Sequence, residues 1–169
     1  MPFAYLALGS NLGDRPAHLR RSIMEISRLP ATRVLQTSRF YGSEPWKMGS
    51  GTPYFLNACA KLETQLSPRE LLQALQGIER RMGGGPKRGK SGQYLDRAID
   101  LDLVLYGDSQ ISDPGPPPLV LPHPGLAQRR FVLAPLLEIQ PGLRDPSTGK
   151  SLARLLEECP DRSRVWALP

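Results

Sequence analysis

The chain has 169 residues, 40% of them hydrophobic and 22% charged, which is typical of one globular domain spanning residues 1–169. No run approaches the roughly 18 apolar residues of a membrane span, and the N-terminus lacks the pattern of a signal peptide, so we expect a cytoplasmic protein without a membrane partner. Lysine and arginine exceed aspartate and glutamate by 22 to 16, which indicates an anionic partner without separating nucleic acid, lipid and nucleotide.

The N-terminal part is expected to begin with a strand and a helix. Residues 3–8 are apolar and predict a short strand, and residues 9–14 predict a turn that can cap the next helix. Residues 16–29 carry apolar side chains at helical spacing. Residues 32–41 are rich in β-forming types and predict a second strand, whereas Gly, Ser and Pro predict a loop over residues 42–53.

A third strand and a second helix follow this loop. Residues 55–63 alternate in character, so that Phe55 and Asn57 share the face opposite the apolar residues. A capping box with proline at the first helical position begins a helix over residues 68–82, and its leucines and isoleucine form one buried stripe. These two elements are expected to pack against each other through their apolar faces.

A glycine-rich basic loop covers residues 83–92 and includes Lys87 and Arg88. Residues 84–91 also match the G-x-x-x-x-G-K-S pattern of a phosphate loop. That motif needs a preceding strand and a helix that starts at its lysine, whereas here a helix precedes the loop and a strand follows it. We therefore favour a flexible lid over a bound anion, and a phosphate-loop kinase is the weaker alternative.

Two aspartates stand out in the next predicted strand, over residues 97–106. Because successive side chains of a strand point to opposite faces, Asp100 and Asp102 share one face, roughly 6.5–7 Å apart. Strands disfavour aspartate and like charges repel, so the pair either decorates a solvated face or holds a cation. The basic residues just upstream, including Arg97, favour a site where carboxylates, cations and polyphosphate meet.

Three other polar residues allow two interpretations each. Gln76 and Glu79 lie beside the buried stripe of their helix, where they either reach a ligand at the helix edge or form an ordinary exposed pair. His123 lies between Pro122 and Pro124, which hold its backbone. Its imidazole either packs and caps locally or donates a hydrogen bond to a phosphate.

The remaining chain predicts short elements. These are a turn at 107–109, a stiff linker at 113–118, a short edge strand at 119–121, helices over 129–139 and 151–158, and a last strand at 165–166. The order strand, helix, strand, strand, helix, strand predicts an α+β fold with an antiparallel sheet, helices on one face, and additional C-terminal helices. Phe55, Asn57, Asp100 and Asp102 would then share the open face. Cys59 and Cys159 are expected to be reduced thiols.

Many short motifs, in this order, resemble the 6-hydroxymethyl-7,8-dihydropterin pyrophosphokinase family. They include Ala7-Leu8-Gly9-Ser10-Asn11-Leu12-Gly13, Phe55-Leu56-Asn57-Ala58, Leu66-Ser67-Pro68, Ile99-Asp100-Leu101-Asp102, Leu121-Pro122-His123-Pro124 and Phe131-Val132-Leu133-Ala134-Pro135-Leu136. Each motif is weak alone, but together they cover almost the whole chain. The resemblance implies a ferredoxin-like βαββαβ core, in agreement with the order of elements above.

The resemblance also implies an activity. Members of the family transfer diphosphate from ATP to the hydroxymethyl oxygen of a reduced pterin and release AMP, using two Mg²⁺ ions, in folate biosynthesis. The expected partners are therefore small-molecule substrates, with no nucleic acid, and the protein is expected to be a monomer.

The resemblance assigns roles to residues at matching positions. Asp100 and Asp102 are the expected magnesium ligands. The expected catalytic residues beside them are Arg97, at a matching position, and Lys87 and Arg88, which come later in the loop than the basic residues of the family, where this chain has Gly84 and Gly85. The expected pterin site comprises Ser43, Glu44, Trp46, Phe55, Asn57 and Phe131. The expected ATP site comprises Gln76, Glu79, Tyr94, Arg97, His123 and Arg129, with Tyr94 replacing an aromatic lid residue.

One alternative belongs to another functional class. Ferredoxin-like sheets also bind RNA, and the chain is basic, so a non-catalytic RNA-binding module is a second hypothesis. The sequence lacks the aromatic-rich strand signature of such modules, which makes the pyrophosphokinase the preferred interpretation.

Overall fold

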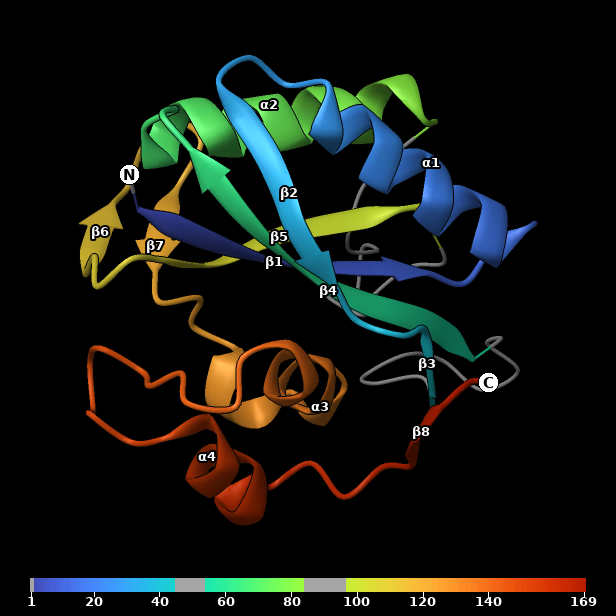
Figure 1. The fold of residues 1–169 in the computed structure, drawn as a ribbon, viewed down its shortest axis with the longest axis vertical. Helices are drawn as coiled ribbons and strands as arrows, with labels where there is room; N and C mark the ends of the chain where they lie inside the picture. The colour runs from blue at the N-terminus through green and yellow to red at the C-terminus, as the bar shows by residue number, and fades with distance from the viewer. Residues whose placement is uncertain (1, 45–53, 84–96) are drawn as a thin grey trace.

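The structure is a computed structural model that describes residues 2–44, 54–83 and 97–169 (Figure 1). Its helices are α1 (Arg15–Ser27), α2 (Pro68–Arg81), α3 (Arg130–Ile139) and α4 (Leu152–Glu158), with a 3-10 turn at Leu126–Gln128. Its strands are β1 (Phe3–Ser10), β2 (Thr32–Thr37), β3 (Tyr41–Ser43), β4 (Phe55–Thr64), β5 (Asp100–Tyr106), β6 (Ile111–Asp113), β7 (Leu119–Leu121) and β8 (Val165–Ala167).

Six of these strands form one antiparallel sheet in the order β5-β1-β4-β3-β8, and β2 pairs with another part of β4. The remaining two, β6 and β7, form a separate hairpin pair. The α+β class with a βαββαβ core, predicted from the sequence, is confirmed. β1 lies between β4 and β5, so it separates the two strands that carry the most polar residues of the predicted site.

The sheet separates two hydrophobic clusters because its side chains alternate between the faces. On β1, Leu6 and Leu8 pack toward α1 and α2, whereas Tyr5 packs in the second cluster with α3 and α4. Figure 1 shows α1 and α2 above the sheet and α3 and α4 below it. The C-terminal helices therefore cover part of the face that the sequence predicted to be open, and the remaining part holds the polar residues.

The helices begin where the sequence supplies caps. Asp14 caps α1 by accepting a hydrogen bond from the Ala17 amide, at 3.1 Å. Ser67 caps α2 by accepting one from the Glu70 amide, at 3.1 Å. Both helices also have proline in the first turn, where its missing N–H costs nothing. These signals are local, which is why both helix starts were predictable.

The prediction of a single strand over residues 32–41 is wrong, because this stretch contains β2 and the start of β3 as two separate strands. Ser38, between them, donates its amide to Cys59 O at 2.9 Å and accepts from Cys59 N through its side-chain oxygen, also at 2.9 Å. This side-chain acceptor replaces the carbonyl that a continuous strand would offer. The chain then turns so that β3 pairs with β4 on one side and β8 on the other.

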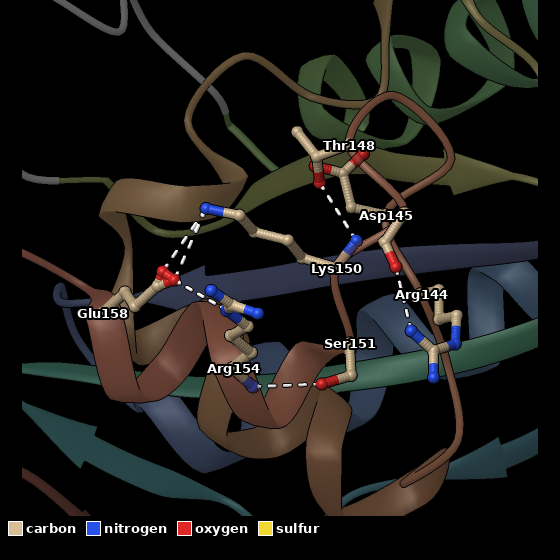
Figure 2. A network of polar contacts seen from close by, with 8 residues as sticks. Arg144, Asp145, Thr148, Lys150, Ser151, Arg154 and Glu158 are labelled. Atoms are coloured by element: carbon tan, nitrogen blue, oxygen red, sulfur yellow. Dashed lines mark hydrogen bonds and ion pairs between the residues drawn. The ribbon is translucent and has the colours of Figure 1, made fainter.

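α4 and the turn before it are held by exposed polar contacts (Figure 2). Ser151 caps α4 by accepting from the Arg154 amide. Within the network, Lys150 Nζ and Arg154 Nε reach Glu158 at 3.3 and 3.0 Å. Contacts of this exposed kind contribute little individually.

Candidate active site

β5 presents two carboxylates on the face of the sheet opposite α1 and α2. Leu101 and Leu103 are buried in the cluster beneath those helices. Asp100 and Asp102 alternate with them and line one pocket on the other face. Their side chains keep 16% and 18% of their exposure, so both carboxylates are accessible to a ligand. The prediction that the two aspartates share a face is confirmed.

Each of the two aspartates forms an ion pair with a different arginine. Arg97 Nη2 lies 3.1 Å from Asp100 Oδ2, and Arg129 Nη1 lies 3.3 Å from Asp102 Oδ2. Both guanidinium groups line the same pocket and are largely buried, which strengthens their interaction with any anion that enters. The pocket thus holds carboxylates suited to a cation next to guanidinium groups suited to phosphate.

His123 lies beside Asp102 and makes a local hydrogen bond through its ring. Its backbone amide donates to Val104 O on β5 at 2.9 Å, and its Nδ1 accepts from the Gly125 amide at 2.9 Å. With Nδ1 as the acceptor, the neutral imidazole carries its proton on Nε2. That nitrogen lies 4.0 Å from Asp102 Oδ1. His123 does not line the pocket itself but a small adjoining cavity, together with Asp102 and Arg129.

Asn11 does not line the pocket but holds the backbone of Arg97, a role that sequence reasoning missed. Its buried side chain accepts a hydrogen bond from the Arg97 amide at 2.7 Å through Oδ1, and its own amide donates to Arg97 O at 3.1 Å. The backbone of Arg97 is therefore paired with a turn after β1, and β5 begins at Asp100 rather than at residue 97 as predicted. The only available signal was a polar residue inside a glycine-rich turn, which does not specify a distant partner.

Two aromatic rings form the other part of the pocket. Phe55 comes from the start of β4 and Phe131 from the first turn of α3, and both line the pocket together with Val132. The pocket encloses about 550 Å³, including space open to solvent at its mouth. The flanking aromatic groups suit a flat, ring-shaped ligand.

Asn57 lines the same pocket and is almost fully buried. Its Nδ2 donates to Ser43 Oγ at 2.7 Å and to Tyr41 O at 3.3 Å. Its Oδ1 lies next to Gly9, where an added Cβ would come within 3.4 Å of that oxygen. Both amide hydrogen bonds hold the side chain in one orientation, so Asn57 is positioned before any ligand arrives.

The structure does not place Gln76 and Glu79 among the residues that line the pocket. Both lie on α2, and the buried Glu79 carboxylate accepts from the Leu101 amide at 2.8 Å. Leu101 is the residue between the two aspartates, so Glu79 contacts their strand from the helix side. Ser43 and Glu44 do line the pocket. The predicted site residues Trp46, Lys87, Arg88 and Tyr94 lie outside the described residues.

Glu138 connects α3 to the strand that carries Ser43. It accepts hydrogen bonds from the Arg39 amide at 2.9 Å, from Arg39 Nε at 3.0 Å and from the Tyr41 hydroxyl at 2.5 Å. Burial alone would raise the pKa of Glu138, but these donors together hold that pKa below its usual value. Burial and the neighbouring Glu138 raise the pKa of Tyr41, so the phenol remains the donor.

The described residues, apart from the segments 45–53 and 84–96, contain no group of three histidine, cysteine, aspartate or glutamate side chains placed to hold a metal. They also contain no helix that is long and apolar enough to cross a membrane. The pair Asp100 and Asp102 fits Mg²⁺, which commonly binds through one or two carboxylates, substrate phosphates and water.

The fold and the site define an α+β protein whose pocket combines carboxylates, which suit a cation, with arginines, which suit an anion. Enzymes that transfer phosphoryl groups use this arrangement. Residues 5–141 match the family model of 7,8-dihydro-6-hydroxymethylpterin-pyrophosphokinase (HPPK). The chain belongs to this family.

Curated relatives support the same assignment. The chain is 43% identical to 2-amino-4-hydroxy-6-hydroxymethyldihydropteridine pyrophosphokinase of Porphyromonas gingivalis, over 85% of this chain and 94% of that protein. It is 37% identical to the protein of the same name from Synechocystis, over 96% of this chain and 78% of that one. The "Folic acid synthesis protein fol1" of Schizosaccharomyces pombe is 39% identical over 94% of this chain, which spans only 21% of that protein.

Solved structures share the fold. The wild-type HPPK-DHPS of Plasmodium falciparum superposes with a TM-score of 0.72 at 13% identity, covering 93% of this chain and 44% of that one. Another HPPK-DHPS structure, in complex with substrates, gives a TM-score of 0.74 at 12% identity, over 93% and 43%. At this identity the likeness concerns the fold alone. The comparisons support neither the RNA-binding module nor the phosphate-loop kinase.

Proposed function

We propose that this protein transfers a diphosphate group from ATP to the hydroxymethyl oxygen of 6-hydroxymethyl-7,8-dihydropterin, releasing AMP, as a step of folate biosynthesis. The observation that carries the proposal is one pocket in which Asp100 and Asp102, each paired with an arginine, face Phe55 and Asn57 across β1. One side of this pocket suits a metal-bound polyphosphate and the other suits a flat heterocycle, and membership of the HPPK family supports both assignments.

Asp100 and Asp102 are the proposed ligands of two Mg²⁺ ions. Their oxygen atoms are the donor type that Mg²⁺ prefers, and substrate phosphates would complete its coordination. When bound, the metal ions neutralise the charge of the phosphates and of the leaving group. Arg97 and Arg129 lie beside the carboxylates, so their guanidinium groups are placed near where phosphate oxygens would bind.

The protein's own contribution is mainly positioning. Phosphoryl transfer has little covalent chemistry for side chains to perform, so rate enhancement depends on holding the attacking oxygen and the phosphate in line. His123 presents its Nε2 proton on the phosphate side. Lys87 and Arg88 are proposed catalytic residues. Tyr94 and Gln76 are proposed to contact ATP. Glu79 supports β5 through Leu101, besides the ATP contact that the resemblance implies.

The pterin is proposed to lie between Phe55 and Phe131. Stacking on two rings would orient the heterocycle, while Asn57 would bind its polar edge through the side-chain oxygen next to Gly9. Ser43, Glu44 and Trp46 are proposed to contribute at the rim. The monomeric state, the cytoplasmic location and the single domain over residues 1–169 stay predictions.

The test is the nucleotide product. Purified protein is incubated with ATP, Mg²⁺ and the reduced pterin alcohol, and the nucleotides are separated by chromatography. We expect AMP, formed only when the pterin is present. ADP would instead indicate transfer of a single phosphoryl group, and folded protein that releases neither nucleotide would contradict the proposal.

A further inference from the structure

The last part of the chain lies beyond the region that matches the family model, which ends at residue 141. This part contains α4 and β8, and we name residues 161–167 the C-terminal connector. In Figure 1 the chain passes from α4, below the sheet, to β8 at the edge of the sheet. The connector contacts two separate parts of the pocket wall, although none of its own residues lines the pocket.

The first contact is with the rim formed by Ser43 and Glu44. Val165 of β8 pairs with Ser43 in an antiparallel ladder. The Glu44 amide donates to Arg164 O at 3.1 Å, and the Arg164 amide donates to Glu44 Oε1 at 2.8 Å. β3 has only three residues, so β8 supplies half of its strand pairing. Without the connector, Ser43 and Glu44 would lie at an unpaired edge.

Trp166 strengthens the same contact through its ring. The indole lies so close to Gly42 that an added Cβ there would come within 2.3 Å of the ring. The ring also lies 5.5 Å from that of Tyr54, measured between centroids. Tyr54 directly precedes the pocket residue Phe55, so Trp166 touches the neighbours of pocket residues on both β3 and β4.

The second contact is with the start of α3. Asp161 Oδ2 accepts a hydrogen bond from the Arg130 amide at 3.3 Å. Arg130 lies between Arg129, which pairs with Asp102, and Phe131, which lines the aromatic part of the pocket. Asp161 Oδ1 accepts from Ser163 at the same time, through its amide and its hydroxyl, which fixes the carboxylate.

We propose that the C-terminal connector is a positioning element for the pterin, because it ties the Ser43 and Glu44 rim to the helix start that carries Phe131. The proposal rests on the proposed function. Asp161 and Trp166 are positioning residues that act through the pocket wall, without contact to the substrate. They set the separation between the rim and Phe131, so their loss should weaken pterin binding more than ATP binding.

The test compares Asp161→Ala, Asp161→Asn, Trp166→Ala and Trp166→Phe with the wild-type enzyme in steady-state AMP release. For each of the two alanine variants we expect the KM for the pterin to rise about fivefold, the effect of losing roughly one hydrogen bond or an equivalent contact. We expect kcat and the KM for ATP to change by less than about twofold, the pattern of a lost binding contribution. Trp166→Phe keeps an aromatic ring over Gly42, and Asp161→Asn keeps an acceptor, so both should restore most of the affinity.

Arg154→Ala is the matched control. Arg154 belongs to the exposed network on α4 (Figure 2), in the same C-terminal part but away from the connector, and its loss should leave both KM values unchanged. The proposal is overturned if Asp161→Ala and Trp166→Ala leave the pterin KM unchanged, or if both KM values rise equally. If Trp166→Ala does not fold, the comparison of Asp161→Ala with Asp161→Asn decides. A wild-type enzyme that forms no AMP would instead overturn the proposed function.

Discussion

Asn11 and Arg97 are joined by two reciprocal hydrogen bonds, although 86 positions separate them in the chain. Asn11 Oδ1 accepts from the Arg97 amide at 2.7 Å, and the Asn11 amide donates to Arg97 O at 3.1 Å. The guanidinium of Arg97 in turn pairs with Asp100. The turn after β1 thus fixes the backbone position of Arg97, a pocket residue. It thereby also positions the positive charge of Arg97 next to the proposed metal ligands.

Asn11→Ala should slow catalysis by removing the acceptor of the Arg97 amide. We expect kcat to fall about tenfold because the guanidinium loses its fixed backbone. AMP release at saturating substrates measures this. Asp14→Ala, in the same turn, is the control: it removes the α1 cap and should lower the free energy of unfolding by about 1 kcal/mol without lowering kcat. Equal kcat in Asn11→Ala and wild type would contradict the expected role.

Asp102→Asn should abolish most activity while preserving the fold. The amide keeps the size of the side chain but removes the charge that would hold Mg²⁺, and we expect kcat to fall by about a hundredfold or more. Activity and circular dichroism are measured on the same sample. A rate close to that of the wild type would exclude Asp102 as a metal ligand.

Glu79→Ala should destabilise the protein from the helix side of β5. It leaves the Leu101 amide, now bonded at 2.8 Å, without its buried acceptor, which should lower the free energy of unfolding by about 1–3 kcal/mol. Chemical denaturation measures the change. Glu79→Gln retains an acceptor oxygen and should lose less, and no difference between the two variants would show that this hydrogen bond contributes nothing.

The contribution of Glu138 to stability should depend on pH. Because the Tyr41 and Arg39 donors hold the pKa of Glu138 below its usual 4.5 despite burial, the ionised form stabilises the folded state. This contribution is fully present above the unfolded pKa and is lost as the pH falls through the lower folded pKa. Wild type should therefore exceed Glu138→Gln in stability at pH 7, and the difference should shrink below about pH 4. A difference that does not vary with pH would contradict this.

Gly42→Ala should destabilise the sheet edge because its new Cβ meets the Trp166 ring at 2.3 Å. The expected cost is about 1–3 kcal/mol of unfolding free energy, typical of overpacking. In a Trp166→Ala background the same change should cost much less, since the clashing ring is gone. A double-mutant cycle measures the coupling, and additive effects would argue against the contact.

The parts of the site that follow from local pattern were predictable. Alternation along one strand placed Asp100 and Asp102 on a common face, and alternation along another placed Phe55 and Asn57 there too. The capping signals gave the helix starts. These features depend on the geometry of a single element, so the sequence of that element specifies them.

Contacts between distant segments could not be read in the same way. The break between β2 and β3 depends on a Ser38 side chain that bonds Cys59. The predicted residue range of β8 was nearly correct, but its pairing with β3 joins two segments that are far apart in the chain. Sequence periodicity describes which face of an element is apolar, but it does not identify the partner of that face.

The central position of β1 has a consequence for the chemistry. Gly9 pairs with Asn57 on one side and with Asp100 on the other, so two strand spacings, about 10 Å in all, separate the backbones of the heterocycle side and the phosphate side. The hydrogen bonds between the backbones of neighbouring strands set this distance. Substitutions among the leucines under α1 and α2 would lower stability yet leave the distance between the two substrates unchanged, which gives the core freedom to diverge while the reaction geometry persists.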